Sequence, residues 1–130
     1  MEKRIYIASD TKVFSDAVKL FDAIIEMTPN FPRDYKYTIG GQMQTLAMQL
    51  MLGIQHAFMM KEQRQDHLKM FICDFEVLQV LVRKAGEKRW ISTTKHAETS
   101  ELMISIGKQI TAWKNRPGKA GEGRNPGGQG

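Results

Sequence analysis

The amino-acid sequence predicts an all-α fold, an antiparallel up-down bundle of four helices. Four segments of the 130-residue chain repeat apolar residues at the three- and four-residue spacing of one helix face. No two segments alternate apolar and polar residues as a pair of strands would. The connections between the four segments span a few residues, and short connections place consecutive helices side by side in opposite directions.

The first helix is predicted to begin after Ser9 or Asp10, since either side chain caps a helix N-terminus. Pro29 and Pro32 end it, because a proline inside a helix removes a backbone hydrogen bond and clashes with the preceding turn. Its core face is predicted to be the stripe Phe14, Val18, Phe21 and Ile25.

The second helix is predicted to begin near Arg33–Tyr35 and to run to about Lys61, on the order of 40 Å in length. The third is predicted from about Asp66 to Ala85, with Gly86 as the residue that ends it in a left-handed conformation. The core face predicted for this third helix is Leu68, Phe71, Phe75, Leu78 and Val82.

The fourth helix is predicted to open at Ser92 or Thr93 and to close before Pro117 and Gly118. Its core face is predicted to be Met103, Ile106, Ile110 and Trp113. The four helices together define a bundle over residues 9–116, preceded by a short arm of residues 1–8. Residues 117–130 are rich in Gly and Pro and lack large apolar side chains, which predicts a flexible, basic tail.

The sequence favours a cytoplasmic protein. The single Cys73 cannot form an internal disulfide, which fits a reducing compartment. The first residues contain no apolar signal core. The densest apolar run covers residues 46–54, far less than the roughly 20 residues that a membrane-spanning helix needs.

Two of the predicted helices are too apolar for an isolated bundle. An outer helix of a bundle needs one apolar stripe, but residues 46–54 place apolar side chains on all sides. The third helix likewise carries six apolar residues beside its main stripe: Met70, Ile72, Cys73, Val77, Val80 and Leu81. A second apolar face in water favours aggregation, so we expect another copy of the chain or a partner to cover it.

No catalytic, metal or cofactor site is predicted. His56, His67 and His96 fall in different helices, and none takes part in a spacing typical of zinc or di-iron sites. Cys73 stands among Phe71, Ile72 and Phe75, which predicts a buried thiol without activation. A non-enzymatic protein is therefore expected.

The basic residues are concentrated in the second half of the chain. From Arg83 onward there are ten Lys and Arg against four Asp and Glu, whereas residues 1–82 carry nine against ten. A solvated helix face with a basic tail is one interpretation; a surface for nucleic-acid phosphates is the other. The candidate contacts are Lys61, Arg64, Lys69, Arg83, Lys84, Lys88, Arg89, Lys108, Lys114 and Arg116.

Trp90 follows directly after Lys88 and Arg89 and has two interpretations. An exposed indole stacks on nucleic-acid bases, and a loop tryptophan equally often covers the end of a core. The sequence leaves both open.

Three stretches resemble, in the same order, motifs of one family of small four-helix proteins. They are residues 31–42 (FPRDYKYTIGGQ), 81–85 (LVRKA) and 101–113 (ELMISIGKQITAW). This family joins the 23S rRNA intervening-sequence proteins to the accessory variability determinant (Avd) of diversity-generating retroelements. The resemblance covers about residues 12–116, and the Gly-rich tail favours the retroelement branch.

The resemblance implies a homopentameric barrel of four-helix protomers with a basic outer surface. It also implies binding to the element's reverse transcriptase and to template-repeat RNA or a cDNA–RNA hybrid, in support of mutagenic cDNA synthesis, with no active site of its own. The chain departs from the family at Gln44 and Thr45, where relatives often carry basic residues, and at Lys108, which replaces an Arg. Two alternatives stay open: an intervening-sequence-type protein acting with ribosomal RNA or in an unknown role, and a structural oligomer whose charge serves solubility.

Overall fold

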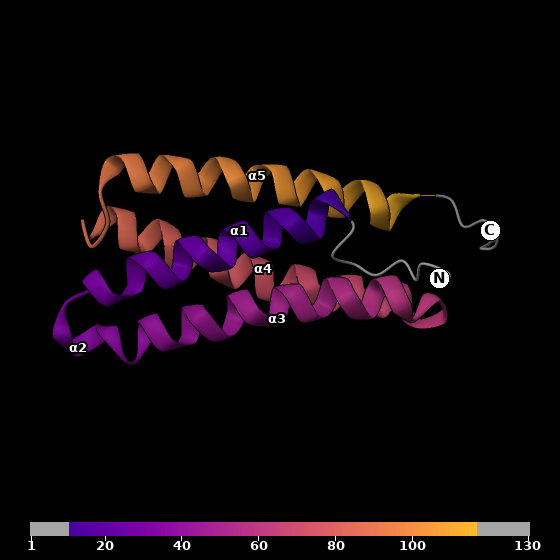
Figure 1. Cartoon of the computed structure of the whole chain (residues 1–130), viewed down its shortest axis with the longest axis horizontal. Helices are drawn as coiled ribbons and strands as arrows, with labels where there is room; N and C mark the ends of the chain where they lie inside the picture. The colour runs from indigo at the N-terminus through magenta and orange to yellow at the C-terminus, as the bar shows by residue number, and fades with distance from the viewer. Residues whose placement is uncertain (1–10, 117–130) are drawn as a thin grey trace, which may run out of the picture.

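Four long helices pack around one apolar core in the computed structural model, which describes residues 11–116 (Figure 1). The predicted antiparallel all-α fold is confirmed: each long helix packs against two neighbours, in the order α1, α3, α4, α5 and back to α1. The helices are α1 (Lys12–Met27), α2 (Arg33–Lys36), α3 (Ile39–Met59), α4 (Arg64–Glu87) and α5 (Thr93–Asn115). Two 3-10 turns lie in the connections, η2 (Thr28–Asn30) and η3 (Lys61–Gln63).

The core faces predicted for the last two long helices are confirmed. All five predicted stripe residues of α4 are buried, from Leu68 to Val82. On α5, Met103, Ile106 and Ile110 are buried and Trp113 is half-buried. Ser92 caps α5 by accepting a hydrogen bond from the backbone N–H of Lys95. Each of these faces is a single apolar stripe, and burying it accounts for the position of the helix.

The core face predicted for α1 is wrong by one residue. The buried stripe is Val13, Ala17, Leu20, Ile24 and Met27, whereas Val18 and Ile25 are exposed. Asp16 lies on the buried side, so its charge made that face look polar in the sequence. The cap is Thr11, which accepts a hydrogen bond from the N–H of Phe14, and not Ser9 or Asp10. The predicted arm (1–8) and tail (117–130) lie outside the described residues.

The second predicted helix is divided in two. α2 ends at Lys36, and α3 begins at Ile39 after Tyr37 and Thr38. The hydroxyl of Thr38 donates to the carbonyl of Asp34 (3.3 Å), which satisfies a backbone acceptor at the end of α2. A Cβ on Gly40 would lie 3.2 Å from Cβ of Thr28, so this glycine allows α3 to approach the η2 turn.

The prediction that Gly86 ends α4 in a left-handed conformation is wrong. Gly86 lies inside the helix, where an added Cβ would clash with the ring of His96 on α5. Arg89 adopts the left-handed conformation instead, with φ 61°. Its N–H donates to the carbonyl of Gly86 (3.1 Å), and the N–H of Trp90 donates to that of Ala85 (2.9 Å). These two bonds form a Schellman motif with an arginine at the position usually held by glycine.

Cys73 is exposed, contrary to the prediction that it is buried. It lies on the outer side of α4, on the same face as exposed Met70, Val77 and Val80. Among residues 11–116, no helix is both long enough and apolar enough to cross a bilayer.

A buried carboxylate connects α1 to α5. Asp16 is 5% exposed and accepts hydrogen bonds from Lys12 Nζ (2.7 Å) and Gln109 Nε2 (2.8 Å). Burial raises the pKa of this carboxyl group, but the bonds from Lys12 and Gln109 and the charges of Lys12 and Lys19 outweigh burial. The pKa therefore lies below the ordinary value of 3.8.

Replacing Asp16 by Asn is expected to lower the free energy of unfolding by about 1–3 kcal/mol at neutral pH, because Asp16 is buried and its partners Lys12 and Gln109 lose a charged acceptor. Since the folded pKa lies below the unfolded one, the carboxylate stabilises the fold above the ordinary value of 3.8 and loses this effect as the pH falls below it. The difference between wild type and Asp16→Asn in urea unfolding should therefore shrink at acid pH. Asp22→Asn, an exposed acid on the same helix, is the control and should change little. A constant difference between neutral and acid pH would contradict this assignment.

Replacing Arg89 by Gly is expected to raise the free energy of unfolding by about 1 kcal/mol, since glycine adopts the left-handed conformation without the steric cost of a Cβ. Lys88→Gly removes the same charge at a residue with φ −84° and should lower stability instead. Chemical denaturation of the two variants beside the wild type measures both effects. Equal changes for the two variants would show that charge, and not backbone conformation, decides stability at this turn.

Candidate nucleic-acid interface

The antiparallel arrangement gathers most of the predicted cationic residues at the two ends of the bundle. One end carries α2 and the α4–α5 connection; the other carries the α3–α4 connection and the last turn of α5 (Figure 1). We call the first the α2 end and define it by Arg33, Lys36, Lys84, Lys88 and Arg89. We call the second the η3 end and define it by Lys61, Arg64, Lys69, Lys114 and Arg116. The sequence places Lys84, Lys88 and Arg89 together, and likewise Lys61, Arg64 and Lys69. The fold adds Arg33 and Lys36 to the first group and Lys114 and Arg116 to the second.

Two predicted residues belong to neither set. Arg83 lines the groove between α4 and α5, beside Val80 and Ile104. Lys108 is exposed on α5, about two turns before the helix ends. Arg83 and Lys108 therefore remain candidate nucleic-acid contacts outside the two sets.

At the η3 end, Arg64 is engaged in the fold. Its Nε donates to the carbonyl of Ala57 (2.7 Å), and one terminal nitrogen donates to that of Phe58 (3.3 Å). Its guanidinium also lies 5.4 Å from the centre of the Trp113 ring. Arg64 therefore satisfies carbonyls at the C-terminus of α3 and packs on α5, which leaves less of it for a phosphate.

At the α2 end, the basic residues differ in how they are paired. Lys84 lies 3.4 Å from Glu87 in an exposed ion pair, which contributes little in water. Lys88 and Arg89 are exposed and form no ion pair with another residue in the 11–116 range. Uncompensated cations on a turn are available to an anionic ligand at low energetic cost.

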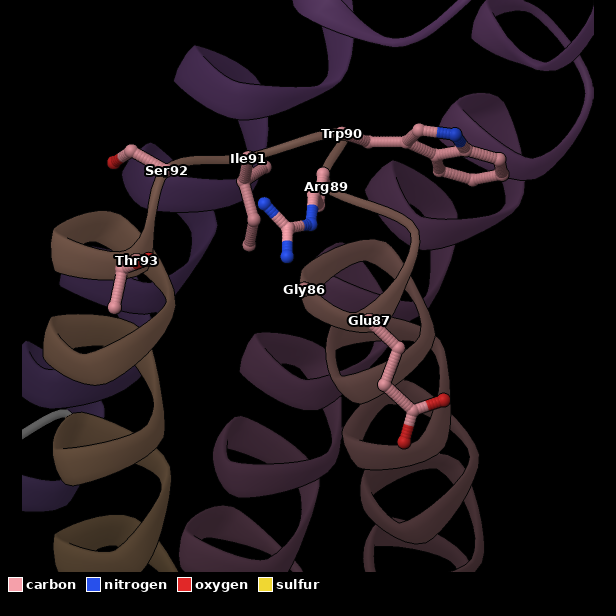
Figure 2. Close-up of a pocket in the computed structure, with 7 residues that line it drawn as sticks. All are labelled: Gly86, Glu87, Arg89, Trp90, Ile91, Ser92 and Thr93. Atoms are coloured by element: carbon pink, nitrogen blue, oxygen red, sulfur yellow. The ribbon is translucent and has the colours of Figure 1, made fainter.

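The α4–α5 connection also encloses a shallow pocket, lined by Gly86, Glu87, Arg89, Trp90, Ile91, Ser92 and Thr93. Figure 2 shows the Arg89 side chain turned beneath the connection, toward Ile91 and the end of α4 at Gly86. The indole of Trp90 projects away from that side. The side chains of Arg89 and Trp90 thus lie on different sides of the connection.

Trp90 covers the end of the core. Its ring lies 5.0 Å from that of Phe31, at an angle of 46°, and 5.0 Å from that of Tyr35, at an angle of 21°. The indole is half-buried between two connections that are far apart in the sequence. Of the two interpretations left open by the sequence, the core-covering one describes this geometry.

Sequence reasoning missed two aromatic residues at the same end. Tyr35 is 42% exposed and Tyr37 is 82% exposed, and Lys36 Nζ lies 5.7 Å from the centre of the Tyr37 ring. The RDYKY stretch, residues 33–37, carried the signal, because it alternates cations with aromatics. The sequence predicts one continuous helix here, whereas Tyr37 lies in the break between α2 and α3 and is exposed.

The structure also brings His56 and His67 together, with ring centres 5.0 Å apart. The sequence placed them in different helices without indicating this contact. Within residues 11–116, no cluster of three or more His, Cys, Asp or Glu side chains suits a metal ion. Asp74 on α4 has a pKa raised by burial.

The two neighbouring helices α3 and α4 expose apolar side chains. α3 contains no Asp, Glu, Lys or Arg along its 21 residues. Its outward face exposes Met48, Leu52 and Met59, while α4 exposes Met70, Val77 and Val80. Apolar side chains exposed on one face of two neighbouring helices are typical of a surface that another protein covers.

A comparison with known proteins identifies the family. No curated protein matches the chain. A family model described as bAvd-like matches residues 11–117, which include the whole described bundle. The match covers most of the 130 residues and agrees with the resemblance carried by residues 31–42, 81–85 and 101–113. The chain belongs to the bAvd-like family, a family of non-catalytic accessory proteins.

Proposed function

We propose that this protein is the accessory variability determinant of a diversity-generating retroelement. In this proposal it binds the template-repeat RNA and the element's reverse transcriptase in the cytoplasm and supports mutagenic cDNA synthesis, while the polymerase alone carries the chemistry. Membership of the bAvd-like family supports the proposal. The observation that carries it is the set of uncompensated cations at the α2 end, above all Lys88 and Arg89.

Phosphate contacts account for this arrangement. Lysine and arginine side chains that neutralise phosphates release counterions, which makes binding salt-sensitive and weakly dependent on sequence. Fixed by the Schellman motif, the α4–α5 connection presents Lys88 and Arg89 from a rigid turn. At the η3 end, Lys61, Lys69, Lys114 and Arg116 form the second candidate contact surface.

The proposal includes assembly into a homopentamer. The uncharged α3 and the apolar outer face of α4 give each protomer a surface suited to a neighbouring copy. These surfaces lie between the two cationic ends, so assembly leaves both ends free. Several copies then multiply a modest cationic surface into a larger one.

The binding of RNA is expected to weaken steeply between about 50 and about 300 mM salt, with a slope near 0.7 for each phosphate neutralised on a single strand. Lys88→Gln should lower the affinity for RNA several-fold. It should also reduce the salt slope by about 0.7, the value for one phosphate contact. Lys19→Gln removes the same charge from an exposed position on α1, away from both ends, and should change little. Fluorescence anisotropy with labelled template-repeat RNA measures both quantities.

An affinity that is absent, or equal at the two salt concentrations, would refute the proposed function. Co-purification of the reverse transcriptase with the tagged protein tests the proposed binding between these two proteins. If only ribosomal RNA is recovered, the protein is of the intervening-sequence type.

Leu52→Lys is expected to break the assembly into protomers, because it places a charge in the apolar outer face of α3. Gln42→Lys adds the same charge to an exposed polar position on the same helix and should leave the assembly intact. Light scattering should give five times the 14.9 kDa chain mass for the wild type and for Gln42→Lys. A wild-type mass of one chain would contradict assembly.

A further inference from the structure

We propose that the α2 end binds the unpaired bases of single-stranded RNA by stacking on Tyr37 and on the exposed ring of Tyr35, which packs on Trp90. This inference rests on the RNA binding proposed above and adds the form of RNA recognised and the residues that recognise it.

Tyr37 is the first of the two stacking surfaces. At 82% it is the most exposed large apolar side chain in the described bundle, and its hydroxyl forms no hydrogen bond with another residue of the 11–116 range. It lies in the break between α2 and α3, where the ring does not contribute to the core. Lys36 Nζ lies 5.7 Å from its ring centre, close to a face that a cation favours. Its position therefore suits a ligand and not the stability of the fold.

The second stacking surface is held rigidly. Tyr35 stacks on Trp90 with ring centres 5.0 Å apart and an angle of 21°, and Phe31 supports Trp90 from the core. Tyr35 nevertheless keeps 42% of its surface in water. A ring fixed on one side and open to solvent elsewhere offers a base a flat surface that is already ordered, which lowers the entropy cost of binding.

The segments that carry these rings also carry cations. Arg33 and Lys36 come from α2, while Lys88 and Arg89 come from the α4–α5 connection that also carries Trp90. Their charges exceed those of the neighbouring acids, Asp34 and the Lys84-paired Glu87. Aromatic faces for bases beside cations for phosphates are the two components of single-strand binding surfaces.

The aromatic rings distinguish single strands from duplexes. In a duplex the bases are paired and stacked on one another, so their faces are closed to protein side chains. Cations alone would bind both forms. Every base has a stacking face, so the surface is expected to tolerate many sequences while preferring unpaired RNA.

Tyr37→Ala tests the inference directly. The probes are a labelled oligoadenylate of about 15 nucleotides and a labelled blunt-ended RNA duplex with about the same total number of phosphates. With anisotropy as the readout, Tyr37→Ala should weaken oligoadenylate binding roughly 5- to 100-fold and duplex binding less than about 2-fold. Tyr37→Phe keeps the ring and should bind like the wild type. Lys36→Gln should weaken both probes, since it removes a phosphate contact.

The outcomes separate this inference from the proposed function. If Tyr37→Ala binds oligoadenylate as the wild type does, or weakens both probes equally, the stacking inference is wrong while salt-sensitive RNA binding stands. A wild type that binds neither probe at low salt overturns both. Unfolding curves for Tyr37→Ala should match the wild type because the ring is exposed, whereas Tyr35→Ala would also disturb Trp90 and is less informative.

Discussion

The packing of Trp90 between Phe31 and Tyr35 is the contact on which the α2 end of the molecule depends. It joins the α4–α5 connection to the segment that follows α1, although about 55 residues separate them in the sequence. The left-handed Arg89 directs the chain so that the indole reaches this position. Because the aromatic contact fixes both segments, the cations on α2 and on the connection share one surface.

The surface chemistry of the bundle is divided along its length. Most of the candidate cations stand at the two ends, while α3 has no Asp, Glu, Lys or Arg and α4 exposes Met70, Val77 and Val80 on its outer side. The proposed function combines assembly with the binding of a polyanion, and it needs separate surfaces for the two. An apolar surface away from the cationic ends would keep like charges out of the proposed contact between copies and leave the ends to phosphates.

The sequence predicted the fold class and the core faces of α4 and α5, because large apolar residues recur on each of these faces at three- and four-residue spacing. It failed on α1, where two apolar stripes stand side by side and the buried one includes Asp16, whose charge is compensated by Lys12 and by Gln109 of the distant α5. The residue type predicts that Gly86 forms the turn after α4. The structure shows instead that Gly86 lacks a side chain where His96 of α5 packs closely against α4. The cations were found, but their grouping, the engagement of Arg64 and the exposure of Tyr37 all depend on contacts between distant segments.

The polar contacts between α1 and α5 determine how far one helix can slide along the other. Asp16 with Gln109 and Glu26 with Lys95 connect the two helices at points several turns apart. A shift by one turn would leave the Asp16 carboxylate in the interior without the amide of Gln109, so a single register is favoured. Because α5 spans 23 residues, about 35 Å, and its register against α1 is fixed, the distance between the two cationic ends is fixed as well.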